Sequence, residues 1–590
     1  MSSKKILLLI LLLSSLLRLW SLGSGDTLSD EVLYSFRAIG MLDFDEAADQ
    51  TTPLEWFDPH VPSWTSLSFH DHPPLVFAVQ HIFMSMFGET PFIFRLPSAL
   101  LGIASVYLLY LIGAALYSKE TGLFAAAFFA ATVNHLVISR LGLQESYVIF
   151  FLLLSIYFFL KAERQKIYYT AVGTAVGLAL LTKYTSGILI PIFLTHMLLF
   201  RRSDFSSRYL WLGTMCALLI FSPVLIYNYK LYRAVGHFDF QLSYLVGQNP
   251  DVWSIQPGKE EFPSLAARAT AFFPNLLMFS SWMFLLIFVA SILAFTVSII
   301  KKIPLISHFF RLRRIRPLAE KGGLGGMSPQ YTFLCIVFFW LIILIITVIG
   351  PSLRFLSMLT PFMALGIGAF FANTHLGVRL PAQAGFPISK LLMMGILAFE
   401  ILYSINSQLI LYPKGPKPWT WSRVHYENYH YGYEVLDDWI RAETNGRMPT
   451  LAFEPKYHFI GEIHKKALAQ TEQKNLKPYP VLFVYDKNMQ SIAQLWVLDR
   501  LQVYHAWPII TADTYVQFLN ENGPTYFEDA GFTEMYYIFP TENVPWKKET
   551  NRTDIGIKLE EALTNNGIRI YTTLENRRSE PVFRIYRKEI

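Results

Sequence analysis

Repeated apolar runs are the feature that most constrains how this chain can fold. After a leucine-rich run within residues 1–20, ten further runs fall at roughly 95–116, 121–138, 147–161, 168–182, 187–200, 209–228, 275–299, 331–350, 355–372 and 389–411. A helix of about 20 apolar residues crosses a bilayer. Since 53% of the 590 residues are hydrophobic and 16% are charged, we predict a polytopic α-helical membrane protein with about eleven transmembrane helices.

Charge placement predicts the topology. Lys4 and Lys5 precede the first run, and Arg18 and Trp20 stand where a cleaved signal would need small residues, so we expect an uncleaved helix with a cytoplasmic start. The acid-rich segment that follows, to about residue 74, is then an outer loop. The short run 75–87 is expected to be interfacial or re-entrant, and the basic clusters 161–166, 201–208 and 301–321 to be cytoplasmic.

The last third of the chain has a different pattern. From about residue 412, short β-rich runs at 481–485, 535–539 and 582–586 alternate with helical patterns at 433–441 and 511–520. We therefore predict a membrane domain over 1–411, with an outer loop at 23–74, and a soluble α/β domain over 412–590. Eleven crossings put this second domain outside the cytoplasm.

Charged residues gather at the outer ends of the predicted helices. A charge within a membrane segment costs about 2.5–3.5 kcal/mol on insertion scales, so each one calls for a reason. Carboxylates beside cations at this interface would suit binding a phosphate while activating a hydroxyl. The candidates for such a site are Asp30, Glu31, His72, Arg140, Glu145, Lys183 and Arg354.

Structural explanations for these residues stay open. Ser29 can cap a helix whose first turn holds Asp30 and Glu31. Arg140, like Arg95, can be an interfacial anchor, and Lys183 and Arg354 can simply mark helix ends.

Metal, disulfide and nucleic-acid functions are not favoured. The only cysteines, Cys216 and Cys335, lie in apolar runs, and the net charge of +6 separates by side of the membrane. His70-Asp71-His72 precedes two prolines and is more typical of a turn than of a metal site. Asp43-Phe44-Asp45-Glu46 is similar to a metal-binding motif of nucleotide-sugar enzymes, but such short matches are common in acidic loops. We assign no metal ligand and no cofactor, leaving a divalent metal open, and expect no nucleic-acid partner.

A set of motifs in order along residues 5–375 resembles a known family. The motifs are Asp30-Glu31, His72-Pro73-Pro74-Leu75, Gly88, Arg95-Leu96-Pro97-Ser98-Ala99-Leu100 with Gly102, Ser139-Arg140 with Glu145, Leu181-Thr182-Lys183, and Arg354-Phe355 with Pro361. In order and spacing they resemble the bacterial and archaeal protein O-mannosyltransferases and the lipid A aminoarabinose transferases. These are membrane glycosyltransferases of the GT-C type.

The resemblance implies an inverting glycosyltransferase of the cell membrane that uses a polyprenyl-phosphate sugar donor. By that likeness Asp30 is the general base with Glu31 beside it, and His72 stands where relatives carry a Lys or His that reaches the lipid phosphate. Arg140, Lys183 and Arg354 would help to bind that phosphate, while Glu145 replaces a more common Asp. The acceptor could be a lipid, a protein or a glycan. The alternative function is a transporter or flippase of a lipid-linked saccharide, for which midplane charges and inverted repeats would be typical.

The predicted topology can be tested with reporter fusions after Lys321 and after Ile590. We expect opposite sides of the membrane, because the basic loop is retained in the cytoplasm and the C-terminal domain is not. Reporters on the same side would contradict the predicted number of crossings.

Overall fold

The computed structural model describes residues 2–27, 30–44, 51–253, 262–300, 329–373, 388–424, 430–451, 453–489, 491–544 and 553–590. The chain forms two compact units. The first contains residues 1–22, 67–76 and 95–426, and the second contains residues 23–66, 77–94 and 427–590. Ser29, the acids Asp45 and Glu46 and the basic run 301–321, all considered above, lie outside the described residues.

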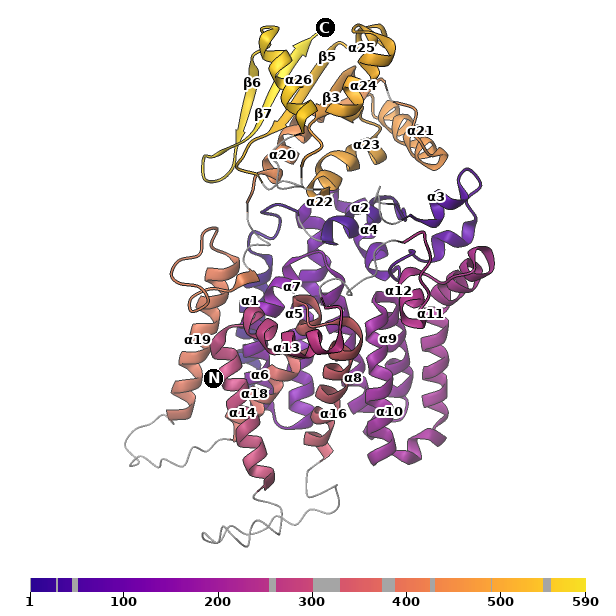
Figure 1. Cartoon of the computed structure of the whole chain (residues 1–590). Helices are drawn as coiled ribbons and strands as arrows, with labels where there is room; N and C mark the ends of the chain where they lie inside the picture. The colour runs from indigo at the N-terminus through magenta and orange to yellow at the C-terminus, as the bar shows by residue number, and fades with distance from the viewer. Residues whose placement is uncertain are drawn as a thin grey trace, which may run out of the picture. The chain divides into compact units, whose positions relative to one another are not determined.

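The first unit is helical (Figure 1). Its helices are α1 (Ser3–Leu19), α5 (Pro91–Leu116), α6 (Lys119–Ala131), α7 (Val133–Arg140), α8 (Gln144–Arg164), α9 (Tyr168–Thr182), α10 (Leu189–Phe200), α11 (Arg208–Val235), α12 (Phe240–Val246), α13 (Leu265–Phe279), α14 (Trp282–Ile300), α16 (Pro329–Leu344), α17 (Leu353–Leu356), α18 (Thr360–Asn373) and α19 (Ile388–Gln408). Short 3-10 turns join several of them, and a π-helical turn at Ile345–Ile349 ends α16.

Six helices in the described residues are long and apolar enough to cross a membrane, or seven if the bent pair α6 and α7 is one span. The pair bends by 62° at Thr132. Shorter apolar helices include α9, α10, α13 and α14, as well as the 13-residue α4 (Leu75–Phe87). The helical membrane architecture is thus observed, and the figure of about eleven crossings stays a prediction.

Helices α9 and α11 lie side by side, and glycine residues at the contact let their backbones approach closely (Figure 1). A Cβ atom on Gly173 of α9 would lie 1.8 Å from the carbonyl oxygen of Gly213 on α11. Small residues let helix backbones approach closely in membranes, where packing rather than the hydrophobic effect drives association. This contact fixes α9, whose last residue directly precedes Lys183.

The second unit contains a five-stranded mixed sheet with strand order β4-β3-β5-β7-β6 (Figure 1). Its strands are β3 (Val481–Tyr485), β4 (Ile509–Thr511), β5 (Glu534–Pro540), β6 (Ile570–Glu575) and β7 (Pro581–Glu589), and β1 (Arg447–Pro449) pairs separately with β2 (Lys477–Tyr479). β3 runs parallel to β4 and β5, whereas β7 is antiparallel to both β5 and β6.

Helices cover both faces of this sheet. On one face, Tyr515 of α24 (Ala512–Asn522) and Leu563 of α26 (Asp554–Asn565) share a buried core with Leu482 and Tyr537. On the other, Trp439 of α20 (Tyr433–Thr444) packs edge-on against Phe483 and Tyr536. The remaining helices are α2 (Asp30–Gly40), α3 (Pro53–Phe57), α21 (His458–Gln473), α22 (Ser491–Gln494), α23 (Arg500–His505) and α25 (Tyr526–Asp529). The predicted strands and helices of the α/β region are therefore confirmed.

The two compact units are divided differently from the predicted domains 1–411 and 412–590, which stay a prediction. The C-terminal segment of the second unit begins at residue 427, and the unit also includes residues 23–66 of the outer loop predicted at 23–74. The reason is a set of polar contacts across about 400 residues of sequence: the Gly25 N–H donates to Glu434, Tyr457 donates to Glu55, and Arg500 pairs with Glu89. Hydropathy alone could not reveal such partners.

Candidate functional site

Three of the predicted site residues meet in the first unit. The Lys183 Nζ lies 2.6 Å from Glu145 Oε1, and Arg354 also acts electrostatically on this carboxylate. The side chains of Glu145 and Lys183 are 2% and 12% exposed. The Lys183 ammonium also lies 4.9 Å from the ring centre of Phe355. Residues from α8, the end of α9 and α17 thus form one charged cluster.

The backbone around α8 holds Glu145 in place. Ser146 donates to the carbonyl of Ser98 on α5 at 2.7 Å, and Ser98 donates to the carbonyl of Leu143 at 3.3 Å. These bonds fix the first turn of α8, where a carboxylate is favoured by the helix dipole. Lys183 follows the last residue of α9, where a cation is favoured for the same reason.

Helix α13 holds the turn that carries Arg354. Arg268 donates to the carbonyls of Thr347 and Val348 at 2.9 and 3.0 Å, and Asn275 donates to that of Pro351 at 2.9 Å. Between these contacts Gly350 has φ of +78°, a conformation that favours glycine. These contacts fix the turn that leads into α17, the short helix that carries Arg354.

This cluster is suited to binding an anion with several oxygens. Lys183 pairs with the Glu145 carboxylate and Arg354 acts on it electrostatically, so the three charges sum to one positive unit. In the part of the chain that the structure describes, Glu145 Oε2 is buried without a hydrogen-bond partner. This oxygen can only accept a hydrogen bond, so a hydroxyl of a bound group could pair with it, whereas the anion itself would contact the cations.

Arg140 binds backbone carbonyls at the end of α1. Its guanidinium donates to the carbonyls of Leu17, Arg18 and Trp20 at 2.9, 3.2 and 2.8 Å, and thereby caps the C-terminal end of α1. Arg95 donates to the carbonyl of Leu22 at 3.1 Å. Cations at a helix C-terminus satisfy carbonyls that lack an intrahelical partner. The contacts of Arg140 favour a role in positioning α1.

His72 lies in the irregular segment before α4. Its Nδ1 is 3.1 Å from Asp71 Oδ1, and the preceding His70 accepts a hydrogen bond through its carbonyl from the Phe240 N–H at 2.7 Å. Pro73 and Pro74 then lead into the helix, as expected for a shaped turn.

The two predicted acids occupy the first turn of α2, in the second unit. Asp30 is partly buried and accepts a hydrogen bond from the Tyr34 hydroxyl at 3.3 Å, whereas Glu31 is fully buried. The segment just before them is held by Asp26, which accepts from the Tyr431 and Glu434 N–H groups at 2.6 and 2.8 Å. Burial raises the pKa of Asp26 to about 7.

Sequence reasoning missed Asp26, Arg268 and Asn275. An isolated cation at the start of an apolar helix is a signal that could have found Arg268, because such charges need a partner. Asp26 and Asn275 gave no comparable signal, since both act by binding backbone groups distant in sequence.

Comparisons with known proteins identify a related family. Residues 71–227 match the profile of the dolichyl-phosphate-mannose-protein mannosyltransferases. The chain is 27% identical over 224 residues to YkcB of Bacillus subtilis, whose description as a mannosyltransferase is itself provisional, and 30% identical over 122 residues to an uncharacterized protein of Aquifex aeolicus. These matches cover 36% and 21% of this chain, and 29% and 28% of the relatives, so the chain spans less than a third of either. The predicted resemblance to membrane mannosyltransferases is confirmed.

Two solved structures are similar over most of the chain. ArnT from Cupriavidus metallidurans, bound to undecaprenyl phosphate, matches with a TM-score of 0.47 and 12% identity, covering 99% of this chain and 98% of that one. The oligosaccharyltransferase of Archaeoglobus fulgidus matches with a TM-score of 0.47 and 14% identity, covering 91% and 69%.

The ion pair predicts a coupled effect on stability. Glu145→Gln should destabilise the protein by at most about 3–5 kcal/mol, because it leaves the partly buried Lys183 without its anion. Adding Lys183→Met should recover part of this loss, since the unpaired charge is removed. Thermal denaturation in detergent measures both variants, with the exposed Lys465→Met as a control that should not change the midpoint. Additive losses in the double variant would contradict a direct pairing.

Proposed function

We propose that this chain is a GT-C-type glycosyltransferase that moves a sugar from a polyprenyl-phosphate carrier to an acceptor hydroxyl, with inversion at the anomeric carbon. It would act at the outer face of the cell membrane, with the second unit outside the cytoplasm. The observation that carries the proposal is that Glu145 and Lys183 form their partly buried ion pair within residues 71–227, the segment similar to mannosyltransferases.

The leaving group explains the need for cations. When the bond between the anomeric carbon and the phosphate oxygen breaks, the carrier leaves as a phosphate monoester that bears additional negative charge. Preorganised cations in a site with little water stabilise such charge strongly. We assign this role to Lys183 and Arg354, with Glu145 orienting Lys183. His72 is proposed to contact the carrier phosphate, and Arg140 to help by holding the end of α1.

The acceptor explains the need for a base. As its oxygen bonds to the anomeric carbon, the hydroxyl must lose a proton, and a positioned base contributes about 10²- to 10⁴-fold in rate. We assign this role to Asp30, which is partly exposed, and a supporting role to the buried Glu31. The hydrogen bond from Tyr34 would hold the Asp30 carboxylate in orientation.

The proposal can be tested with purified protein in nanodiscs and a polyprenyl-phosphate mannose donor. We expect release of polyprenyl phosphate and a product of inverted anomeric configuration. Asp30→Asn keeps the size of the side chain and removes the proton acceptor, so turnover per folded molecule should fall by about 10²-fold or more. Turnover of a nucleotide sugar without any lipid carrier would contradict the proposed donor.

Two matched variants separate catalysis from helix capping. Glu31→Gln should lower turnover less than Asp30→Asn, because Glu31 is assigned only a supporting role. If Asp30 only stabilised the start of α2, Asp30→Asn would cost at most about 0.5–2 kcal/mol of stability and leave turnover nearly normal. Turnover of Asp30→Asn within threefold of the wild type would therefore exclude Asp30 as the base.

A further inference from the structure

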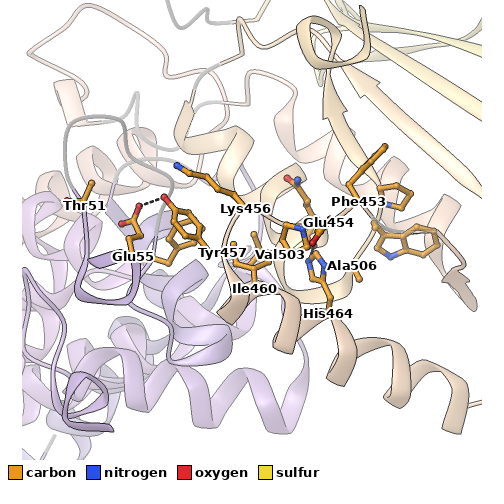
Figure 2. Close-up of a pocket in the computed structure, with 15 residues that line it drawn as sticks. Thr51, Glu55, Phe453, Glu454, Lys456, Tyr457, Ile460, His464, Val503 and Ala506 are labelled. Carbon is orange, nitrogen blue, oxygen red and sulfur yellow. Dashed lines mark hydrogen bonds between the residues drawn. The ribbon is translucent and has the colours of Figure 1, made fainter. Parts of the chain in front are cut away.

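The second unit contains a cavity of about 520 Å³ that none of the proposed catalytic residues line. Its wall brings together segments distant in sequence: Phe44 and Glu55 from the N-terminal part, Glu454 and His464 from the region around α21, and Trp507 after α23. Figure 2 shows Glu55 and Tyr457 joined by a hydrogen bond, with Phe453 and Ala506 on the opposite side of the cavity. This volume lies in the range of small-molecule sites.

One part of the cavity wall is aromatic and largely buried. Phe44 and Trp507 are 1% and 5% exposed. Phe44 packs edge-on against Tyr457, and Tyr457 stacks on Phe459 with ring centres 5.3 Å apart. These contacts hold the ring of Tyr457, which is partly exposed and lines the cavity, as an apolar surface that can pack against the C–H groups of a ligand.

The polar groups of the wall offer both donors and acceptors. In the part of the chain that the structure describes, Glu454 makes no hydrogen bond or ion pair, and it is exposed to the cavity and solvent. His464 Nε2 donates to the carbonyl of Gln502 at 2.9 Å, which leaves Nδ1 of the neutral ring as an acceptor. Burial lowers the pKa of His464, which keeps the ring neutral near pH 7. Lys456 adds a donor.

This lining suits a saccharide better than a peptide. A sugar ring presents C–H groups to an apolar wall and hydroxyls to carboxylates, an imidazole and an ammonium. Extended peptides commonly bind by adding a strand to an open sheet edge. The residues that line the cavity belong to helices and connecting segments, and none of them lies in β1–β7.

Helix α2 links the cavity to Asp30. Asp30 begins this helix, and Phe44 follows its last residue, Gly40, by four positions. The end of α2 packs on α23, where a Cβ on Gly40 would lie 2.6 Å from the ring of Tyr504, next to the cavity residue Val503. Eleven helical residues at 1.5 Å each span about 16 Å. A ligand in the cavity is therefore too far from Asp30 to be the reacting sugar unit itself.

We propose that the cavity binds a saccharide unit of an extended acceptor, several units away from the hydroxyl that receives the sugar. The inference rests on the proposed glycosyltransferase function and narrows its acceptor from a lipid, protein or glycan to a saccharide chain. Binding energy from such a remote unit can position the reacting hydroxyl.

Direct binding tests the inference independently of catalysis. The full chain in nanodiscs is titrated with three fluorescent tetrasaccharides, built from mannose, glucose or N-acetylglucosamine, and with a serine- and threonine-rich peptide of similar length. We expect at least one tetrasaccharide to bind, and Glu454→Ala and Glu55→Gln each to weaken it at least tenfold. Glu462→Gln, on the exposed surface of α21, should bind as the wild type does. Thermal denaturation checks that each variant is folded.

The outcomes separate the inference from the proposed function. Asp30→Asn should bind the tetrasaccharide normally while losing turnover. Binding that is insensitive to both cavity variants, no binding of any tetrasaccharide, or Glu454-dependent binding of the peptide would overturn the saccharide site, even if donor turnover is observed. Cavity-dependent tetrasaccharide binding without any donor turnover would leave the site standing and overturn the proposed reaction.

Discussion

The partly buried ion pair of Lys183 and Glu145 is the interaction on which the charged cluster of the first unit depends. It joins the end of α9 to the start of α8, and Arg354 completes it from α17. Each position is supported by contacts of its own: glycine packing fixes α9 against α11, serine bonds fix α8, and α13 fixes the turn before Arg354. A charge in an apolar setting is costly, and these contacts hold the elements that carry the three charged side chains in place.

The second unit holds helix α2, which carries Asp30 and Glu31. Its sheet is assembled from the C-terminal region, but α2 and α3 come from before residue 60 and are attached through polar contacts with backbone groups. Asp26 binds the first turn of α20, and Asp58 binds the first turn of α21. Carboxylates at helix N-termini are favoured by the exposed N–H groups there. The same attachment builds the wall of the cavity next to Phe44 and Glu55.

Much of this architecture follows from sequence patterns, and the exceptions have clear physical causes. The apolar runs predicted the helices, including the separation of α9 from α10, because burial in lipid requires continuous apolar length. Alternation and β-branched runs predicted β3, β5 and β7. The meeting of Glu145, Lys183 and Arg354 was predictable because charges at the ends of apolar helices need partners. Three features were not predictable: the attachment of residues 23–66 to the second unit, the hydrogen bonds from Arg140 to α1, and the supporting role of Arg268. They depend on backbone carbonyls and N–H groups, which every residue has and which a side-chain pattern therefore does not reveal.

We propose that Lys183 and Arg354 bind the phosphate of a lipid carrier. It is tested most directly by the affinity of the full chain, in detergent, for a polyprenyl phosphate compared with the matching polyprenol. We predict that the wild type prefers the phosphate by at least tenfold, and that Arg354→Gln and Lys183→Gln each reduce this preference while binding the polyprenol as before. Equal binding of the two lipids by the wild type, or an unchanged preference in both variants, would contradict the account.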